Sequence, residues 1–145
     1  LFLLELILAI LFFSLASAVC VQFFVKSHLL SRDARNINHA VNECSGVAEL
    51  VTASDGIEDA MNLIRGVYAE AETVSDTSAI RIYYDDSLAP CSAGDGTYVL
   101  QALFTEEDRM LTAHISMEST EEIQREDPIY QLTAEHYLQR RPSDE

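Results

Sequence analysis

The chain opens with a long apolar stretch. Residues 1–25 contain a single charged residue, Glu5, and the only other polar residues there are Ser14, Ser17 and Gln22. A helix rises 1.5 Å per residue, so this stretch would reach roughly 37 Å, more than the ~30 Å hydrocarbon core of a bilayer. The pattern therefore predicts one helix that lies in lipid or in some other apolar environment.

After residue 25 the apolar positions fall on one face of a helix. They repeat at alternating spacings of four and three, which is the period of an amphipathic helix. No proline precedes Pro90, so nothing forces a break. One helix is expected from Leu1 to about Ala53, with its second half packed on a globular domain. The apolar stripe of that half is Ile37, Val41, Cys44, Ala48 and Val51.

A short second helix is expected next. Ser54-Asp55-Gly56 ends the long helix, and Ser54 or Asp55 could cap a helix that runs to Arg65. Its apolar side would be Ile57, Met61 and Ile64.

From residue 79 the apolar period changes to two, which is typical of half-buried strands. The alternation covers 80–84, 98–104, 110–117 and 129–138, with a turn expected at 105–108 and polar connections expected at 70–78 and 118–127. The sequence thus predicts an α+β fold in which the long N-terminal helix packs on a three- or four-stranded antiparallel sheet. The strand residues expected on one face are Ile80, Ile82, Tyr84, Tyr98, Leu100, Ala102, Phe104, Leu111, Ala113, Ile115, Met117, Tyr130, Leu132, Ala134 and His136.

The charge separates the same two regions. The net charge is −15, and because Glu5 and Lys26 cancel, residues 27–145 also carry −15. Such a domain should repel nucleic acid and anionic head groups, whereas divalent cations or basic partners could be attracted. The expected organisation is a transmembrane or filament-core helix (1–25) and an extracytoplasmic domain (26–145), which comprises an amphipathic helix half (26–53), a short helix and strands (54–138) and a tail (139–145).

The apolar stretch allows three interpretations. A cleavable secretory signal is favoured by Ala16-Ser17-Ala18, but no basic region precedes the apolar run and the run continues to Val25. The second interpretation is an ordinary membrane anchor, and the third is an anchor that also assembles with copies of itself.

Glu5 distinguishes the last two interpretations. A carboxylate inside an apolar helix costs about 2.5–3.5 kcal/mol at the bilayer centre and less near an end, so a partner is expected. The chain starts at Leu1, which suggests a processing site with a free α-amino group. Glu5 of one copy could then meet the Leu1 amine of a staggered neighbour, and a slip of one turn would leave both charges unpaired.

Leu1-Phe2-Leu3-Leu4-Glu5 followed by Leu6-Ile7-Leu8-Ala9-Ile10 resembles the start of a mature type IV pilin or type II secretion pseudopilin. The resemblance implies cleavage before Leu1 by a prepilin peptidase, N-methylation of Leu1, and assembly through Glu5. It also implies a basic leader, which would offset the basic residues after the apolar run, namely Lys26, Arg32 and Arg35. Gln22 stands where many pilins have a helix-bending proline, which favours a divergent or minor subunit.

The sequence thus predicts a structural subunit of a pilus-like filament or secretion pseudopilus. It would reside in the bacterial cytoplasmic membrane and then in a filament at the cell surface. The implied partners are copies of itself, related pilins, the prepilin peptidase, and a membrane assembly platform with its ATPase. The alternative is a monomeric, membrane-anchored extracytoplasmic binding module that uses the sheet or the 85–96 loop.

Cysteines and acidic residues offer two candidate sites in the domain. Cys44 and Cys91 could form a disulfide outside the cytoplasm, which would close a long loop. Asp85, Asp86 and Asp95 could supply oxygen ligands for calcium, although their spacing matches no calcium-binding loop and a solvated acidic loop explains them better.

The remaining candidate residues do not form a catalytic motif. His28 and His39 lie ~16 Å apart along a helix, too far to share a metal ion. His114 and His136 could meet across a strand pair, and Tyr83, Tyr84 and Tyr98 could form either an aromatic patch or part of the core. No nucleophile motif or phosphate-binding loop occurs, so neither an enzyme nor a cofactor is expected.

Overall fold

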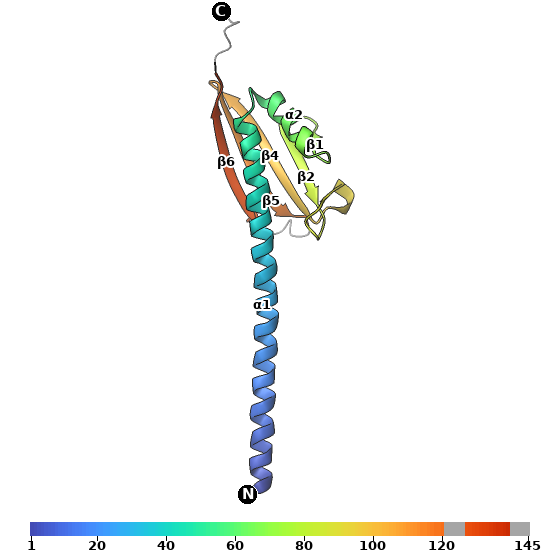
Figure 1. The fold of residues 1–145 in the computed structure, drawn as a ribbon, viewed down its shortest axis with the longest axis vertical. Helices are drawn as coiled ribbons and strands as arrows, with labels where there is room; N and C mark the ends of the chain where they lie inside the picture. Colours follow the sequence, from blue (N-terminus) through green and yellow to red (C-terminus); the bar gives the residue numbers. More distant parts are fainter. Residues whose placement is uncertain (121–126, 140–145) are drawn as a thin grey trace, which may run out of the picture. The chain divides into compact units, whose positions relative to one another are not determined.

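The computed structural model describes residues 1–120 and 127–139. The fold is α+β, as predicted, with one long N-terminal helix and an antiparallel sheet (Figure 1). The elements are helices α1 (Phe2–Thr52) and α2 (Ile57–Val67), a 3₁₀ turn η1 (Ala93–Asp95), and strands β1 (Glu72–Val74), β2 (Ala79–Tyr84), β3 (Pro90–Cys91), β4 (Tyr98–Glu107), β5 (Met110–Ser119) and β6 (Tyr130–Tyr137).

The chain divides into two units, Leu1–Arg35 and Asn36–Glu145. The first unit is the N-terminal part of α1, and every residue in it is exposed. α1 is long and apolar enough to cross a membrane. The chain itself buries none of Leu1–Arg35, in contrast to the core helix of a soluble protein, and a membrane span or a secretion signal would have the same length and composition.

In the second unit, the described strands form one antiparallel sheet with the order β1-β2-β4-β5-β6, and β3 pairs with β2. β4 and β5 pair along their whole length, from Tyr98 opposite Ser119 to Glu107 opposite Met110. Their connection is Asp108 and Arg109, with φ values of 49° and 64°. Two-residue turns with positive φ match the twist of a hairpin. β4 runs to Glu107, so the reversal lies at 108–109 and not across the whole of the turn predicted at 105–108.

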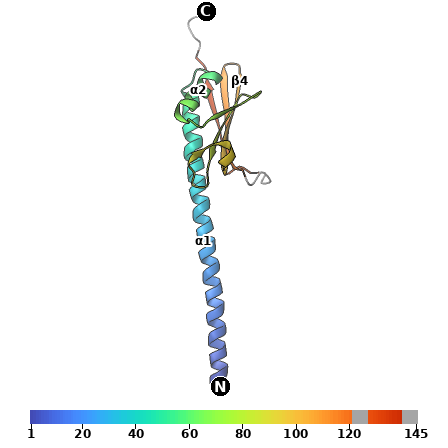
Figure 2. The same ribbon diagram turned by 90° about the vertical axis from the view of Figure 1, so that its right-hand side faces the viewer.

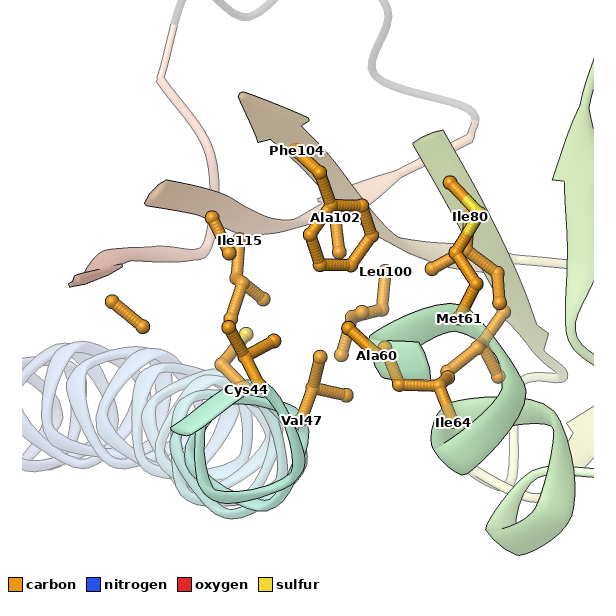
Figure 3. Packing of buried hydrophobic residues seen from close by; sticks show 14 of the residues in the cluster. Cys44, Val47, Ala60, Met61, Ile64, Ile80, Leu100, Ala102, Phe104 and Ile115 are labelled. Atoms are coloured by element: carbon orange, nitrogen blue, oxygen red, sulfur yellow. The ribbon is translucent and has the colours of Figure 1, made fainter. Parts of the chain in front are cut away.

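The hydrophobic core lies between one face of this sheet and two helical segments, α2 and the part of α1 from Asn36 onward (Figures 2 and 3). Cys44 and Val47 point from α1 toward the sheet, while Ala60, Met61 and Ile64 point from α2 (Figure 3). The predicted core faces of β2, β4 and β5 are all buried. The predicted inward face of β6 is half-buried except for Ala134, which is buried.

The apolar stripe of α1 differs in part from the predicted one. Cys44 and Val51 are buried as expected, but Ile37 is 47% exposed. Ala40 and Val47 are fully buried in its place. The buried positions still follow spacings of four and three, so the helical period was right and the face was offset. Small side chains on this face let α1 lie close to the sheet.

The region between the two helices forms without the predicted side-chain cap. The N-cap of α2 is Gly56, with φ 157° and ψ −178°, a combination that favours glycine. Ser54 instead closes α1, because its buried hydroxyl donates to the Val51 carbonyl at 2.6 Å. Asp59 accepts from the Asp55 amide at 3.0 Å. The prediction that Ser54 or Asp55 caps α2 was therefore wrong.

Two short strands were missed, and two predicted segments fall largely outside the described residues. β1 lies in a stretch expected to be a polar connection and β3 in the 85–96 loop, and both pair with β2. Of the polar stretch expected at 118–127, β5 takes the first two residues and 121–126 are not described. Only Gln139 of the predicted tail is described.

Candidate functional site

The apolar helix begins with Glu5 in its first turn. Phe2 is the first helical residue, and the Glu5 amide donates to the Leu1 carbonyl at 3.1 Å. The Glu5 side chain is exposed, as are its neighbours in sequence. Glu5 and Leu1 of one molecule are therefore one helical turn apart, and both are exposed.

The helix face of Glu5 carries both small and large apolar side chains. At about 100° per residue, Ala9, Phe12 and Ala16 share this face with Glu5. A different part of the helix surface carries a shallow apolar groove that contains the small residues Ser14 and Ala18. The full lining is Ile7, Ile10, Leu11, Ser14, Leu15 and Ala18. Small residues allow the backbones of packed helices to approach closely in an apolar environment.

The helix continues without interruption past Gln22. All of Phe2–Thr52 is α-helical, and no residue of this stretch is a proline. The helix thus has no break at Gln22, where many members of the family that the sequence resembles have a helix-bending proline.

A polar seam joins α1 to the sheet, and sequence reasoning missed it. We use the name polar seam for Asn36, His39 and Glu43 on α1 together with Tyr68, Tyr84 and Tyr98. Glu43 accepts from the Tyr84 hydroxyl at 2.9 Å, and the Asn36 amide donates to the Tyr98 hydroxyl at 3.0 Å. The His39 ring meets Tyr84 edge-on at 5.0 Å. The three α1 residues are spaced by three and four along the edge of the buried stripe, a signal visible in the sequence.

Burial and the Glu43 carboxylate disfavour ionisation of Tyr68, Tyr84 and the neighbouring Cys44. Burial, then Glu43, raises the pKa of Tyr68 to about 12 and raises the pKa of Tyr84 further. Burial and Glu43 also raise the pKa of the Cys44 thiol to about 11. Both tyrosines therefore stay protonated, and Tyr84 can donate to Glu43, over the whole physiological pH range.

Cys44 and Cys91 are free thiols in the structure. Cys44 is buried on the core side of β2, the side that Tyr84 also faces. Cys91 lies opposite Tyr83, and side chains directly opposite in an antiparallel pair point to the same side. Since Tyr83 and Tyr84 alternate, Cys91 points away from Cys44, and the disulfide that the sequence allowed is not formed.

The acidic loop residues build turns. One oxygen of Asp85, Oδ1, accepts from the Ser87 amide, the Ser87 hydroxyl and the Ala89 amide at 2.6–3.0 Å, and these hydrogen bonds lower the pKa of Asp85. Asp95 accepts from the Ser92 hydroxyl at 3.2 Å. Asp86 also takes part in an interaction. Within residues 1–120 and 127–139, no three His, Cys, Asp or Glu side chains could hold a metal ion together.

The other histidine and tyrosine candidates are separated by the sheet. His114 is exposed and lies 3.1 Å from the Thr133 hydroxyl, whereas His136 lies opposite the core residue Leu111. The two histidines are therefore on opposite faces. Tyr84 and Tyr98 face the core, while Tyr83 faces outward against Gly96, where a Cβ would lie 2.9 Å from the Tyr83 ring. The sheet thus separates Tyr83 from Tyr84 and Tyr98, and these three tyrosines do not form a common patch.

A groove with polar side chains lies on the outward face of the sheet. Its lining is Gln101, Leu103, His114, Ile115, Ser116, Gln131, Leu132 and Thr133. The groove could accept a polar ligand, and within it the Thr133 hydroxyl lies 3.1 Å from the His114 ring.

Comparison with protein-family models, with curated proteins and with solved structures found no match.

Proposed function

We propose that the chain is a structural subunit of a type IV pilus-like filament or secretion pseudopilus and assembles through its N-terminal helix. One observation carries the proposal. The apolar part of α1, Phe2–Val25, has every side chain exposed and has a carboxylate, Glu5, in its first turn. Such a surface needs lipid or other apolar helices around it, and such a charge needs a partner.

The energetics favour Glu5 as the residue that sets the register. A helix that leaves lipid for a bundle of similar helices gains no hydrophobic free energy, because lipid tails are as apolar as leucine. Assembly then depends on close packing and on whatever polar groups can be paired. If the chain is matured at Leu1, as the family resemblance implies, the ammonium of one copy neutralises Glu5 of the next.

The acidic domain has the role of a coat. Its core is complete within the single chain, with α1 and α2 covering one face of the sheet. Copies held together by their N-terminal helices would therefore present folded domains outside the bundle. The partners are other copies, related pilins, a prepilin peptidase, and a membrane assembly platform.

The test uses the precursor and a matched pair of variants. Co-expression with prepilin peptidase should give a mature chain whose N-terminal sequence starts at Leu1 with Phe2 next. Glu5→Ala should leave membrane insertion intact and abolish incorporation into filaments. Gln22→Ala removes another polar side chain from the same helix and should leave assembly largely unchanged. A different mature N-terminus, or normal assembly of Glu5→Ala, would contradict the proposal.

A second candidate function is a monomeric membrane-anchored binding module, and the groove on the outward face of the sheet favours it. Gln101, Gln131 and His114 offer hydrogen-bond donors and acceptors. A module of this kind would keep its binding when Glu5 is replaced. Loss of ligand binding in His114→Ala, together with unchanged binding in Glu5→Ala, would favour the binding module over the filament subunit.

A further inference from the structure

We propose that the helical segment 26–35, here called the basic segment, is a docking surface for the acidic domain of a second copy of this chain. The inference rests on the proposed function, because it supposes that copies lie side by side. The basic residues beyond the apolar stretch have no role in the register set by Glu5, and their position needs a separate explanation.

The charge of the chain changes sign at this segment. Lys26, Arg32, Asp33 and Arg35 give residues 26–35 a charge of +2. With −1 from Glu5 and a total of −15, residues 36–145 carry −16. A short basic stretch between an apolar helix and a strongly acidic domain is complementary to that domain in another copy.

The basic segment is accessible and regular. Every residue in it is exposed and helical. Spacings of four and three place His28, Arg32 and Arg35 along one face, and Lys26 lies on another. The segment therefore presents positive charge in more than one direction, as a subunit with neighbours on several sides requires.

The acidic surface that would meet it is spread over the domain. Glu58 and Asp59 are exposed at the start of α2, Glu107 and Asp108 at the β4–β5 hairpin, and Glu135 on β6. A groove at the start of α2 collects Asp55, Glu58, Asp59 and Glu106 with no basic side chain in its lining. A neighbour therefore presents carboxylates in most orientations.

Anionic lipid head groups are the competing partner. Basic residues next to a membrane span attract them and favour the cytoplasmic side. However, a domain with a charge of −16 follows the basic segment directly, and it would be repelled by the same head groups. A second copy also carries a basic segment of its own, which offsets part of the repulsion between the two acidic domains, whereas anionic head groups offer no net positive charge in return.

The expected effect is moderate and depends on salt. An exposed ion pair contributes little by itself, and its removal changes an association constant by about two- to fivefold. Screening strengthens as the Debye length falls from about 30 Å at 0.01 M salt to about 3 Å at 1 M. The attraction between the basic segment and an acidic surface should therefore weaken as salt is added, so the loss caused by a change in the basic segment should be larger at low salt than at high salt.

The experiment measures self-association of the full chain in uncharged detergent micelles by sedimentation, at low and high salt. Arg35→Glu should weaken association about fivefold or more at low salt and by a smaller factor at high salt. Arg65→Glu makes the same charge change on α2, in the acidic domain, and should leave association equal or slightly stronger. Equal weakening by both variants, or no effect of Arg35→Glu, overturns the proposal.

Two further arms separate the alternatives. If Arg35→Glu weakens binding to vesicles that contain anionic lipid and leaves self-association unchanged, the lipid is the partner and the proposal is wrong. Glu5→Ala tests the filament function independently. If Glu5→Ala associates normally while Arg35→Glu does not, the proposed assembly mechanism fails but the basic segment still docks a second copy.

Discussion

α1 is one continuous helix, but the chain buries side chains only in its second half and leaves its first half exposed. Between Phe2 and Val25 most side chains are apolar and many are large, and all are exposed. Between Asn36 and Thr52 the buried side chains are small: Ala40, Cys44, Val47 and Val51. The more hydrophobic part of the helix is therefore the part that the chain itself does not cover.

This contrast shows that hydrophobicity alone does not say what will bury a residue. The second half needs small side chains because it lies against a sheet of fixed shape, with packing as tight as in other protein interiors. The first half needs only an apolar surface of sufficient length, since lipid or similar helices adapt to it. A substitution should therefore act very differently in the two halves.

The largest expected effect is that of a buried charge in the second half. Val47→Asp places a carboxylate among core side chains without a partner and should lower the free energy of unfolding of the domain by about 3–5 kcal/mol. Chemical denaturation followed by circular dichroism measures it.

The matched variants are Asn42→Asp, which adds a charge on the exposed side of the same half, and Val19→Asp in the apolar half. The first should change stability by less than about 0.5 kcal/mol. The second should impair membrane insertion and leave the unfolding of the domain unchanged. If all three variants lowered the free energy of unfolding of the domain by similar amounts, burial by the chain itself would not distinguish the two halves of α1.

A smaller effect is expected at the polar seam. Tyr84→Phe removes the hydroxyl that donates to Glu43 at 2.9 Å, which leaves a half-buried carboxylate with one donor fewer. The expected loss of stability is about 1–3 kcal/mol. Tyr83→Phe, on the outward face of the same strand, serves as the control and should cost much less. An equal loss in both variants would show that the seam does not fix α1 on the sheet.

The sequence predicted most of the fold because the periods were clear. The alternation in 98–104 and 110–117 identified the buried faces of β4 and β5 residue by residue. The strands β1 and β3 were missed because three- and two-residue strands are too short for any period, and only their pairing with β2 defines them. Ile37 was placed in the core because a helical period fixes a repeat and leaves the contacting face open.

The candidate site was predictable in part. Glu5 is conspicuous because it is the only charge in 25 residues. The seam was not found, because Asn36, His39 and Glu43 are ordinary polar residues until tyrosines from distant segments meet them. The side of β2 on which Cys91 lies also depends on a two-residue strand, so the sequence could not decide whether it meets Cys44.

The smallest effect is expected from alkaline pH, and it concerns only the second half of the helix. In the unfolded chain tyrosine ionises near pH 10, whereas burial and Glu43 raise the pKa of Tyr68 to about 12 and that of Tyr84 further. Above pH 10 the unfolded state therefore binds fewer protons than the folded state, and stability falls as the pH rises. The contribution of these groups is fully present below pH 10 and is lost progressively above it.

Urea denaturation at a series of pH values between 8 and 11.5 measures this slope. Tyr84→Phe removes one group with a raised pKa and leaves Tyr68 and Cys44, whose pKa values are raised to about 12 and about 11, so it should make the decline shallower, although the variant is less stable at pH 8. Tyr83→Phe should keep the steeper slope. The first half of α1, residues 1–35, contains no tyrosine, so any membrane insertion of that half should not follow the same curve. An unchanged slope in Tyr84→Phe would mean that Tyr84 ionises as freely in the folded domain as in the unfolded chain, and would place its hydroxyl in contact with water.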